Sequence, residues 1–461
     1  MINFENTYSN LPEEFYEKAD PASFPKASLL AFNYKLAEEL GIDVSSKSEA
    51  QLAMIFSGQE ILEGSEPLAM AYAGHQFGHF VPQLGDGRAL LLGETKGFDI
   101  QLKGGGRTFF SRGGDGKSAL GPVIREYILS EAMHQLKVPT TRALAAVLTN
   151  EPVYRQEAEP GGVFTRVAKS HLRVGTFQFF ASRQDHKNLK VLMDYAIKRH
   201  YPKATSPIEF LVEVAKAQAE LTAIWTSLGF IHGVMNTDNS SIAGITIDYG
   251  PCAFMDEYKA QKVFSSIDRN GRYAFMNQGP ITQWNILRLA ECLIPLIDPD
   301  ENKAVSKIEE SLKFLPGLIQ EKIEEKFSEK LGLPDSNRIL NHLFLSYLEE
   351  NQLDFTLSFR NLPELFNGDS KGYPDTEKLQ RFLSEWRPVA KTKELHSINP
   401  LYIPRNHQVQ RVIDDIYKGQ LDSFKNMNKV LENPYSFNQE LDHFKEPPTN
   451  EQRVTETFCG T

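Results

Sequence analysis

The order of secondary structure along the chain constrains its fold more than any other feature. Strand-like runs come first, at residues 89–94, 98–103, 143–148 and 162–168, and Thr95-Lys96-Gly97 predicts a hairpin between the first two. Helical periodicity follows, at residues 208–228, 282–297, 303–331, 336–350 and 406–432. Strands followed by helices predict an α+β fold with two lobes.

Two helices are also expected within the first 140 residues. Residues 29–40 predict a short helix that ends at Gly41. Pro122 predicts a helix start, and apolar residues recur every four positions from Ile124 until Pro139 ends the helix. We therefore expect four segments: an N-terminal extension (1–80), a strand-rich lobe (81–180), a helical lobe (181–350) and a C-terminal helical extension with a tail (351–461).

The composition of the 461 residues excludes several classes of protein. A formal net charge of -10 predicts that nucleic acid is not a partner. No apolar run reaches the ~18 residues of a membrane span, and the acidic first twenty residues lack the features of a secretory signal. The three cysteines, Cys252, Cys292 and Cys459, are too few for a disulfide framework. We expect a cytoplasmic protein.

Three short motifs resemble known binding sites but lack part of the required pattern. Gly116-Lys117-Ser118 resembles the end of a P-loop, but Ser111 stands where that pattern needs glycine. The same stretch matches a relaxed dinucleotide pattern but follows no buried parallel strand. His75 and His79 have the spacing of a metalloprotease pair, without the acidic residue between them.

The segment HGVMNTDN, residues 232–239, keeps the spacing of a kinase catalytic loop. His232 and Asn239 match its histidine and its metal-binding asparagine, but Val234 stands in place of the catalytic aspartate. Nine residues later, Asp248-Tyr249-Gly250 resembles the D-F-G turn. Asn239 and Asp248 would together supply hard oxygen ligands for Mg²⁺ or Mn²⁺.

Two further residues complete a kinase-like site. Lys103 ends a predicted strand, where kinases carry the lysine that meets the nucleotide phosphates. Glu126 on the next helix is the candidate partner of Lys103, or else a solvated surface residue. A kinase also needs a carboxylate base near the acceptor hydroxyl, which Val234 cannot supply and Asp238 could. The alternatives are an inactive kinase or a kinase fold with altered chemistry.

Several long stretches of the sequence resemble those of a known family. They include AYAGHQFGHFVPQLGDGRALLLGE (71–94), DIQLKGGGRTFFSRGGDGKSAL (99–120), FTRVAKSHLRVGTFQFF (164–180) and IDYGPCAFMD (247–256). The chain closely resembles the selenoprotein O family of protein adenylyltransferases, pseudokinases that transfer AMP. The resemblance implies a protein-kinase-like bilobal fold and an ATP molecule bound in reverse, with its α-phosphorus facing a Ser, Thr or Tyr hydroxyl of a substrate protein or of the enzyme itself.

The resemblance also implies roles for particular residues. Asp238 would accept the proton, Asn239 and Asp248 would hold the metal, and Glu126 would pair with Lys103. The implied nucleotide contacts are Gly85, Gly87, Arg88, Lys103, Asp115, Gly116, Arg166, Arg173 and Asp248. This set suits a triphosphate, because arginine binds phosphate oxygens through two donors and glycine lets backbone N–H groups come close to the phosphates.

One feature departs from the family pattern. Members often carry a redox-active cysteine or selenocysteine near the C-terminus, which Cys459 matches, but the loop after the DYG turn lacks the expected partner. Cys252 would be the substitute. A non-catalytic nucleotide-binding scaffold, motivated by Val234, and UMP transfer with Mn²⁺ remain the competing hypotheses.

Overall fold

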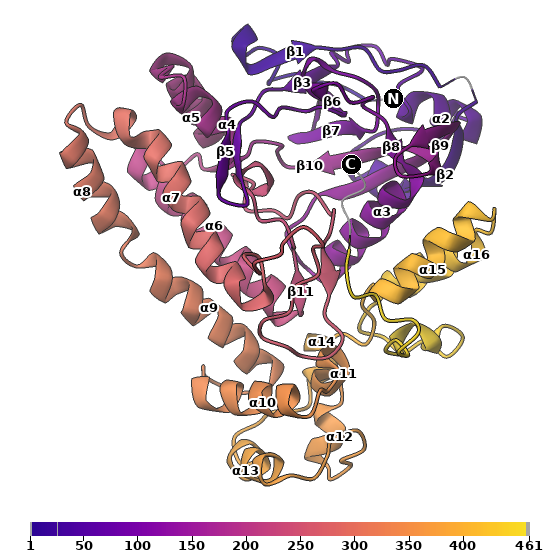
Figure 1. The fold of residues 1–461 in the computed structure, drawn as a ribbon, viewed down its shortest axis with the longest axis vertical. Coiled ribbons are helices and arrows are strands. Elements are labelled where there is room, and N and C mark those ends of the chain that lie inside the picture. Colours follow the sequence, from indigo (N-terminus) through magenta and orange to yellow (C-terminus); the bar gives the residue numbers. More distant parts are fainter. Residues whose placement is uncertain (1, 25, 458–461) are drawn as a thin grey trace.

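The computed structural model describes residues 2–24 and 26–457, and one large antiparallel sheet dominates its N-terminal part (Figure 1). The strand order is β1-β3-β6-β7-β10-β9-β2, with β8 paired to β10. The strands are β1 (Tyr16–Lys18), β2 (Ser28–Phe32), β3 (Leu68–Met70), β6 (Ala89–Thr95), β7 (Phe98–Lys103), β8 (Ser118–Ala119), β9 (Arg142–Tyr154) and β10 (Ala158–Ala168). Strands from the first 80 residues thus pair with the later ones.

The predicted hairpin is confirmed as β6 and β7, which pair from Ala89–Lys103 to Thr95–Phe98. Its two turn residues, Lys96 and Gly97, both have positive φ, at 49° and 75°. Two such residues give a turn whose twist matches that of the strands, which accounts for the tight connection. The register places Lys103 at the end of the hairpin, next to the glycine-dense segment.

The first predicted helix was half wrong. Residues Ser28–Phe32 form the strand β2, which pairs with β9 at the end of the sheet, and only Tyr34–Glu39 form a helix, α1. Asn33 begins that helix, because its side chain accepts a hydrogen bond from the Leu36 N–H. Pairing with β9 therefore overrides the helical periodicity of residues 29–32. Helix α2 (Glu49–Phe56) follows.

Helix α3 (Leu120–Gln135) packs on β9 and β10, and begins two residues before the predicted start at Pro122. Its buried residues surround the helix rather than forming a single stripe. Glu126 is among them at 3% exposure, so the alternative of a solvated surface residue was wrong. The helix is covered on its outer side by the C-terminal helices α15 and α16 (Figure 1).

Helices make up most of the middle of the chain. They are α4 (Val174–Ala181), α5 (His186–His200), α6 (Pro207–Ser227), α7 (Gln278–Ile297), α8 (Glu301–Leu312), α9 (Leu315–Lys330) and α10 (Arg338–Glu350). Predicted helix 208–228 is confirmed as α6, which Ser206 caps and Gly229 follows with a φ of 69°. Predicted helix 303–331 is instead two helices, because Pro316 fits only the first turn of a helix and α9 starts there.

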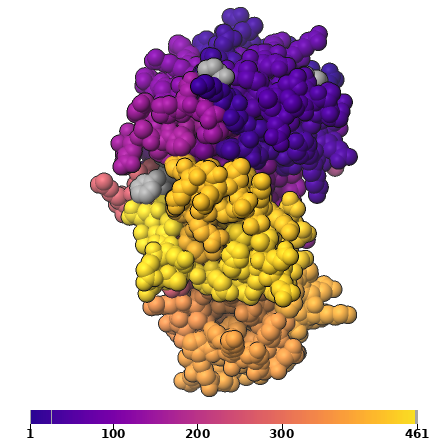
Figure 2. Space-filling view, turned by 90° about the vertical axis from the view of Figure 1, so that its right-hand side faces the viewer, coloured from indigo at the N-terminus to yellow at the C-terminus, as the bar shows by residue number. Residues whose placement is uncertain are grey.

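The C-terminal segment runs back toward the sheet. Its helices are α11 (Phe355–Arg360), α12 (Leu362–Phe366), α13 (Glu377–Trp386), α14 (Leu395–Ile398), α15 (Asn406–Tyr417) and α16 (Asp422–Leu431). Figure 2 shows the end of the chain, in yellow, lying between the sheet above and residues of α10–α14 below. The helices predicted over 406–432 are confirmed as α15 and α16.

The remaining elements are short. They are the strands β4 (Gly74–Gln76), β5 (His79–Val81), β11 (Phe230–Ile231) and β12 (Ala253–Phe254), and the 3-10 turns η1 (Glu13–Phe15), η2 (Phe109–Ser111), η3 (Thr237–Asn239), η4 (Phe275–Asn277) and η5 (Asp442–Lys445). In the described ranges, no helix has both the length and the apolar composition that crossing a membrane requires. The molecule is therefore mixed α/β, with a strand-rich N-terminal part and a mainly helical remainder.

Candidate active site

A cavity of about 560 Å³ contains many of the residues singled out from the sequence. Gly85, Gly87, Arg88, Asp115 and Gly116 line it from the strand-rich part, and Asp238, Asn239 and Asp248 line it from the loops that follow α6. Residues 85 and 248 are far apart in sequence, so the fold brings two separately predicted groups together. Lys103, Glu126, Arg166 and Arg173 do not line this cavity.

The glycine positions of the cavity wall are sterically required. A Cβ at Gly85 would lie 2.2 Å from the Phe110 ring, and a Cβ at Gly87 would lie 2.9 Å from the Phe110 carbonyl oxygen. Gly116 has a φ of 69°, and a Cβ there would lie 2.0 Å from the Gly106 oxygen. A side chain at Gly87 or Gly116 would therefore collide with neighbouring backbone, and a side chain at Gly85 would collide with the Phe110 ring.

A buried ion cluster lies behind the cavity. Glu126 accepts hydrogen bonds from Lys103 Nζ at 2.7 Å and from Arg166 Nε at 2.8 Å, so the predicted pairing of Lys103 with Glu126 is present. Lys103 Nζ also contacts Asp248 Oδ1, and Arg166 Nη2 lies 3.5 Å from the same oxygen. Two cations and two carboxylates thus join β7, β10, α3 and the DYG turn.

The charges of this cluster decide the ionisation of its carboxylates. Burial alone would raise the pKa of Asp248, but Lys103 and Arg166 lower it far below its usual range. Burial opposes ionisation of Glu126 in the same way, and Arg166 and Lys103 outweigh it, so its pKa is also lowered. Both carboxylates are therefore anionic, and Asp248 presents a negative charge to the cavity.

Arg173 takes a different position from Arg166. It is 5% exposed, its guanidinium lies 4.3 Å from the centre of the Tyr72 ring, and Nη2 is 3.6 Å from Asp86 Oδ1. Tyr72 lines the cavity, whereas Arg173 does not line it and lies against the Tyr72 ring. The positive charge of Arg173 therefore acts on the cavity through the aromatic wall.

Asp238 is the buried carboxylate of the catalytic-loop segment. Gln76 Nε2 donates a hydrogen bond of 3.1 Å to Oδ2, while Oδ1 is buried with no hydrogen-bond partner in the described part of the chain. Burial raises the pKa of Asp238 to about 6. Val234, where a kinase has its base, also lines the cavity, so Asp238 is the carboxylate available for proton transfer on this side.

Asn239 and Asp248 fit a divalent cation. Asn239 Nδ2 donates to the Val234 carbonyl at 3.1 Å, which turns its amide so that the oxygen is left for another partner. Within residues 2–24 and 26–457, no three His, Cys, Asp or Glu residues cluster as a complete metal cage. Mg²⁺ needs no such cage when substrate phosphates supply ligands, so one carboxylate and one amide oxygen suit it.

Asp115 lies at the edge of the cavity. Its carboxylate accepts hydrogen bonds from both terminal nitrogens of Arg155, at 3.0 and 3.1 Å, and from the Lys117 N–H at 3.0 Å. Arg155 holds the pKa of Asp115 below its usual range. Asp115 therefore fixes the conformation of its loop in this structure.

The two cysteines in the described part of the chain do not favour a redox role. Cys252 and Cys292 are buried free thiols, and burial raises the pKa of Cys252 to about 12, so its thiolate is disfavoured. Cys459 lies outside the described residues, and its role remains a prediction.

Sequence reasoning missed Gln76, Tyr72 and Asp86. Gln76 orients Asp238, Tyr72 forms the wall in front of Arg173, and Asp86 binds Arg173 and Gln101. All three belong to the stretch 71–94 that carries the family resemblance. The high density of polar residues and glycines in that stretch was the sequence signal that could have indicated these three residues.

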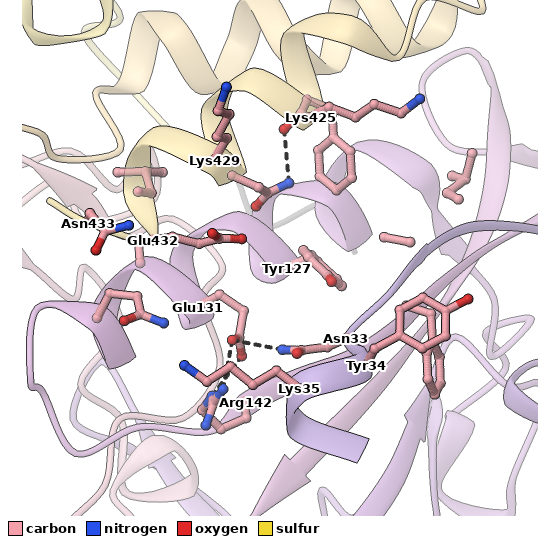
Figure 3. Close-up of a pocket in the computed structure, with 18 residues that line it drawn as sticks. Asn33, Tyr34, Lys35, Tyr127, Glu131, Arg142, Lys425, Lys429, Glu432 and Asn433 are labelled. Atoms are coloured by element: carbon pink, nitrogen blue, oxygen red, sulfur yellow. Dashed lines mark hydrogen bonds and ion pairs between the residues drawn. The ribbon is translucent and has the colours of Figure 1, made fainter. Parts of the chain in front are cut away.

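A second cavity, of about 680 Å³, lies against another face of α3, between α16 and the start of α1 (Figure 3). Glu131 points into it and is bound by Asn33 and Arg142. None of the predicted site residues lines it. The smaller cavity, lined by the glycine loops and by Asp238, Asn239 and Asp248, is therefore the candidate active site.

Together, the glycine loops, the Lys103–Glu126 pair and the positions of Asn239 and Asp248 are those expected of an enzyme that acts on a nucleotide. Comparison with known proteins gives its family. The family described as "Protein adenylyltransferase SelO" matches residues 1–434. The chain belongs to this family and is a nucleotidyltransferase.

Curated relatives agree over their full length. A protein nucleotidyltransferase YdiU of Agrobacterium fabrum is 47% identical over 100% of both chains. Proteins of the same name from Nitrobacter hamburgensis and Maridesulfovibrio salexigens are 48% and 46% identical, over 100% of this chain and 96% and 99% of theirs. The family implies a nucleotide substrate, protein acceptors and, typically, a divalent metal ion.

Proposed function

We propose that this chain transfers AMP from ATP to Ser, Thr or Tyr hydroxyls of proteins, including its own, in a protein-kinase-like bilobal fold. The observation that carries the proposal is Asp238: a buried carboxylate with one unpartnered oxygen, in the same cavity as Asn239 and Asp248. The strand-rich lobe is 81–180 and the helical lobe 181–350, with extensions at both ends.

The reaction needs a base beside the acceptor and a positive environment around the triphosphate. Asp238 accepts the proton of the acceptor hydroxyl while the oxygen attacks the α-phosphorus. The bond from that phosphorus to the oxygen that bridges it to the β-phosphate breaks, and pyrophosphate leaves. Asn239 and Asp248 would hold Mg²⁺ or Mn²⁺, which neutralises charge on the phosphates.

The nucleotide contacts follow the reversed orientation of ATP. Gly85, Gly87 and Gly116 offer backbone approach to the phosphates, and Arg88 lines the same cavity. Lys103, Arg166 and Arg173 lie behind the cavity wall and contribute positive potential at the β- and γ-phosphate end of ATP. An ATP-bound structure with the terminal phosphate at the open mouth, away from these cations, would contradict this orientation.

The decisive experiment uses ATP labelled separately at the α- and γ-phosphates. We expect protein-bound label only from the α position, a mass increase of one adenylyl group, and loss of both in Asp238→Asn with nucleotide binding retained. Label from the γ position alone would instead indicate a kinase.

Two competing functions are tested in the same experiment. The scaffold hypothesis, motivated by Val234, predicts ATP binding without any transferred label. UMP transfer predicts that UTP with Mn²⁺ competes and labels the protein better than ATP does.

A further inference from the structure

Two arginines enclose one indole ring next to the catalytic loop. The guanidinium carbon of Arg272 lies 4.7 Å from the centre of the Trp284 ring, and that of Arg288 lies 4.8 Å from the same centre. Trp284 lies on α7, and Arg272 lies in the loop between the DYG turn and that helix. Indole is the aromatic ring that attracts cations most strongly, so it can hold both side chains in place.

The two arginines differ in their partners, since Arg288 forms an ion pair with Glu291 and Arg272 forms none among the described residues. Within the described ranges, no carboxylate lies within 4 Å of the Arg272 guanidinium, and Nε and Nη2 are buried without a hydrogen-bond acceptor. Arg288 pairs with Glu291 at 2.5 Å through Nη2, while its Nε also lacks an acceptor. Asp268 lies nearby, but its two oxygens accept hydrogen bonds from the backbone N–H groups of Arg272 and Tyr273.

The effect of these charges is visible at a neighbouring ring. The His75 ring lies 5.2 Å from the Trp284 ring, and its pKa is lowered by burial and then by the charges of Arg288 and Arg272. The neutral form of His75 is therefore favoured, and the ring adds no charge of its own. Arg272, Trp284 and Arg288 thus form a surface that carries two cations, in a chain with a formal net charge of -10.

This surface adjoins the proposed acceptor side of the active site. The hairpin of β4 and β5 separates the two: Gln76 binds Asp238 from one strand, and a Cβ at Gly78 in the turn would lie 3.6 Å from the Arg272 guanidinium. The Tyr273 hydroxyl, one residue from Arg272, donates to Asn236 Oδ1 at 2.7 Å. Asn236 and Phe77 both line the cavity, so a segment leaving the cavity over this turn meets the arginines.

The surface is also open to a partner. The Arg288 side chain is 24% exposed, and Phe80, whose ring lies 5.0 Å from His75, is 40% exposed. Guanidinium groups match a carboxylate of an acidic peptide segment, since hydrogen bonds between a guanidinium and a carboxylate are strengthened by charge.

We propose that Arg272 and Arg288, held on Trp284, bind an acidic residue of the substrate protein near the acceptor hydroxyl and so determine which hydroxyls are modified. This inference rests on the proposed function and adds to it the class of acceptor sequence. Arg272 and Arg288 are positioning residues, because they would contact the acceptor segment and not the reacting atoms.

The test uses synthetic peptides with one Ser, Thr or Tyr acceptor and a Glu, Gln or Lys placed in turn at each position within five residues of it. Transfer of α-label from ATP is measured with the full-length enzyme. We expect kcat/KM for the best Glu peptide to exceed that for its Gln counterpart by about tenfold, mainly through KM, and the preference to weaken with salt.

Charge variants make the test specific. R272Q/R288Q should remove the preference for Glu, and R272E/R288E should reverse it in favour of Lys, while ATP affinity and the melting temperature stay near those of the wild type. R381E is the matched control, since Arg381 is an exposed residue of α13 that pairs only with Glu385 among the described residues. Its preference should equal that of the wild type.

The two proposals fail in different ways. Three outcomes would overturn the substrate inference alone. AMP is transferred with no preference for acidic peptides, R272E/R288E keeps the wild-type preference, or AMP is transferred to the enzyme itself and to no peptide. Absence of any α-label from all proteins and peptides would overturn the proposed function, and the inference with it.

Discussion

Gly74 is in direct contact with Asp238: a Cβ added at Gly74 would lie 2.7 Å from Asp238 Oδ1 and 3.0 Å from its Cβ. The oxygen it approaches is the one without a hydrogen-bond partner. Gln76, two residues further along β4, binds the other oxygen. One short strand therefore sets both the position and the orientation of the proposed base.

Gly74→Ala tests this relationship. The added methyl group should push Asp238 away from its place in the cavity, and displacement of a catalytic group by about 1 Å can cost ~100-fold in rate. We expect kcat for AMP transfer to fall by about 10- to 100-fold, with ATP affinity unchanged in a titration of the same protein. Transfer at the wild-type rate would show that Gly74 does not position Asp238.

Gly317→Ala is the matched control for this prediction. Gly317 lies in α9, and a Cβ there would meet nothing within 4 Å. Because alanine favours helix more than glycine does by about 1 kcal/mol, this variant should be as stable as the wild type or more so, with the same rate of transfer.

Much of the site could be predicted because its parts have local signals. Lys103 ends a strand with clear alternation and hairpin residues, Glu126 lies on a helix bounded by prolines, and Asp248 follows an apolar run. The structure brings Lys103 into contact with both carboxylates. Order and spacing along the chain were sufficient, since each residue belongs to an element that local sequence predicts.

Gln76 and Gly74 could not be predicted in the same way. Gln76 and Asp238 are 162 residues apart in the sequence. The hairpin of β4 and β5, which carries Gln76, has strands of only three residues each. Its pairing with the catalytic loop depends on tertiary contacts, such as His75 N–H to Thr237 Oγ1 at 2.6 Å. The strand β2 was missed for a related reason, because pairing with β9 decides its conformation.

Glu126→Gln should affect both stability and activity. The change leaves Lys103 and Arg166 with Asp248 as their shared carboxylate, and removal of one charge from a buried cluster costs about 3 kcal/mol in unfolding free energy. We also expect kcat/KM for ATP to fall by at least about tenfold, because Lys103 loses the partner that fixes it. Urea denaturation and steady-state kinetics measure the two effects.

Glu131→Gln separates the two effects. Glu131 lies on the same helix, pairs with Arg142 at 2.9 Å and lines the other cavity. The Glu131→Gln variant should have a lower free energy of unfolding than the wild type but the same kcat/KM for ATP. Equal kinetic losses in both variants would mean that Glu126 acts only through the stability of α3.

Arg405 should be one of the residues most important for stability. It is fully buried and binds Asp256 at 2.7 Å, Asp354 at 2.8 Å and the Lys445 carbonyl at 2.8 Å, so it ties the segment after the DYG turn to the C-terminal extension. Arg405→Leu leaves two carboxylates without their counter-ion, and we expect a loss of about 3–5 kcal/mol in unfolding free energy.

The surface pair of Arg453 and Glu257 provides the comparison. Its two side chains are 38% and 37% exposed, so water screens their charges. Arg453→Leu should cost at most about 1 kcal/mol. Similar losses for both variants in urea denaturation would show that burial does not determine the strength of these pairs.

Lys330 should make the stability of the protein depend on pH. It is 4% exposed, and its ammonium group lies 4.4 Å from the centre of the Phe359 ring and 5.5 Å from that of Phe355. Burial lowers its pKa from 10.5 to about 7. Between these values the unfolded chain binds a proton that the folded protein has lost, so the contribution of Lys330 to stability rises with pH, by up to about 1.4 kcal/mol per unit.

Lys330→Met removes this dependence and the cost of the buried amine. The variant should be more stable than the wild type by a margin of a few kcal/mol at pH 7 and below, and the margin should shrink steadily between pH 7 and 10. Lys322→Met, at a residue of the same helix whose side chain is 32% exposed, should show no such pH-dependent gain. Urea denaturation across this pH range measures the margin, and a margin that stays constant would mean that folded Lys330 keeps its proton.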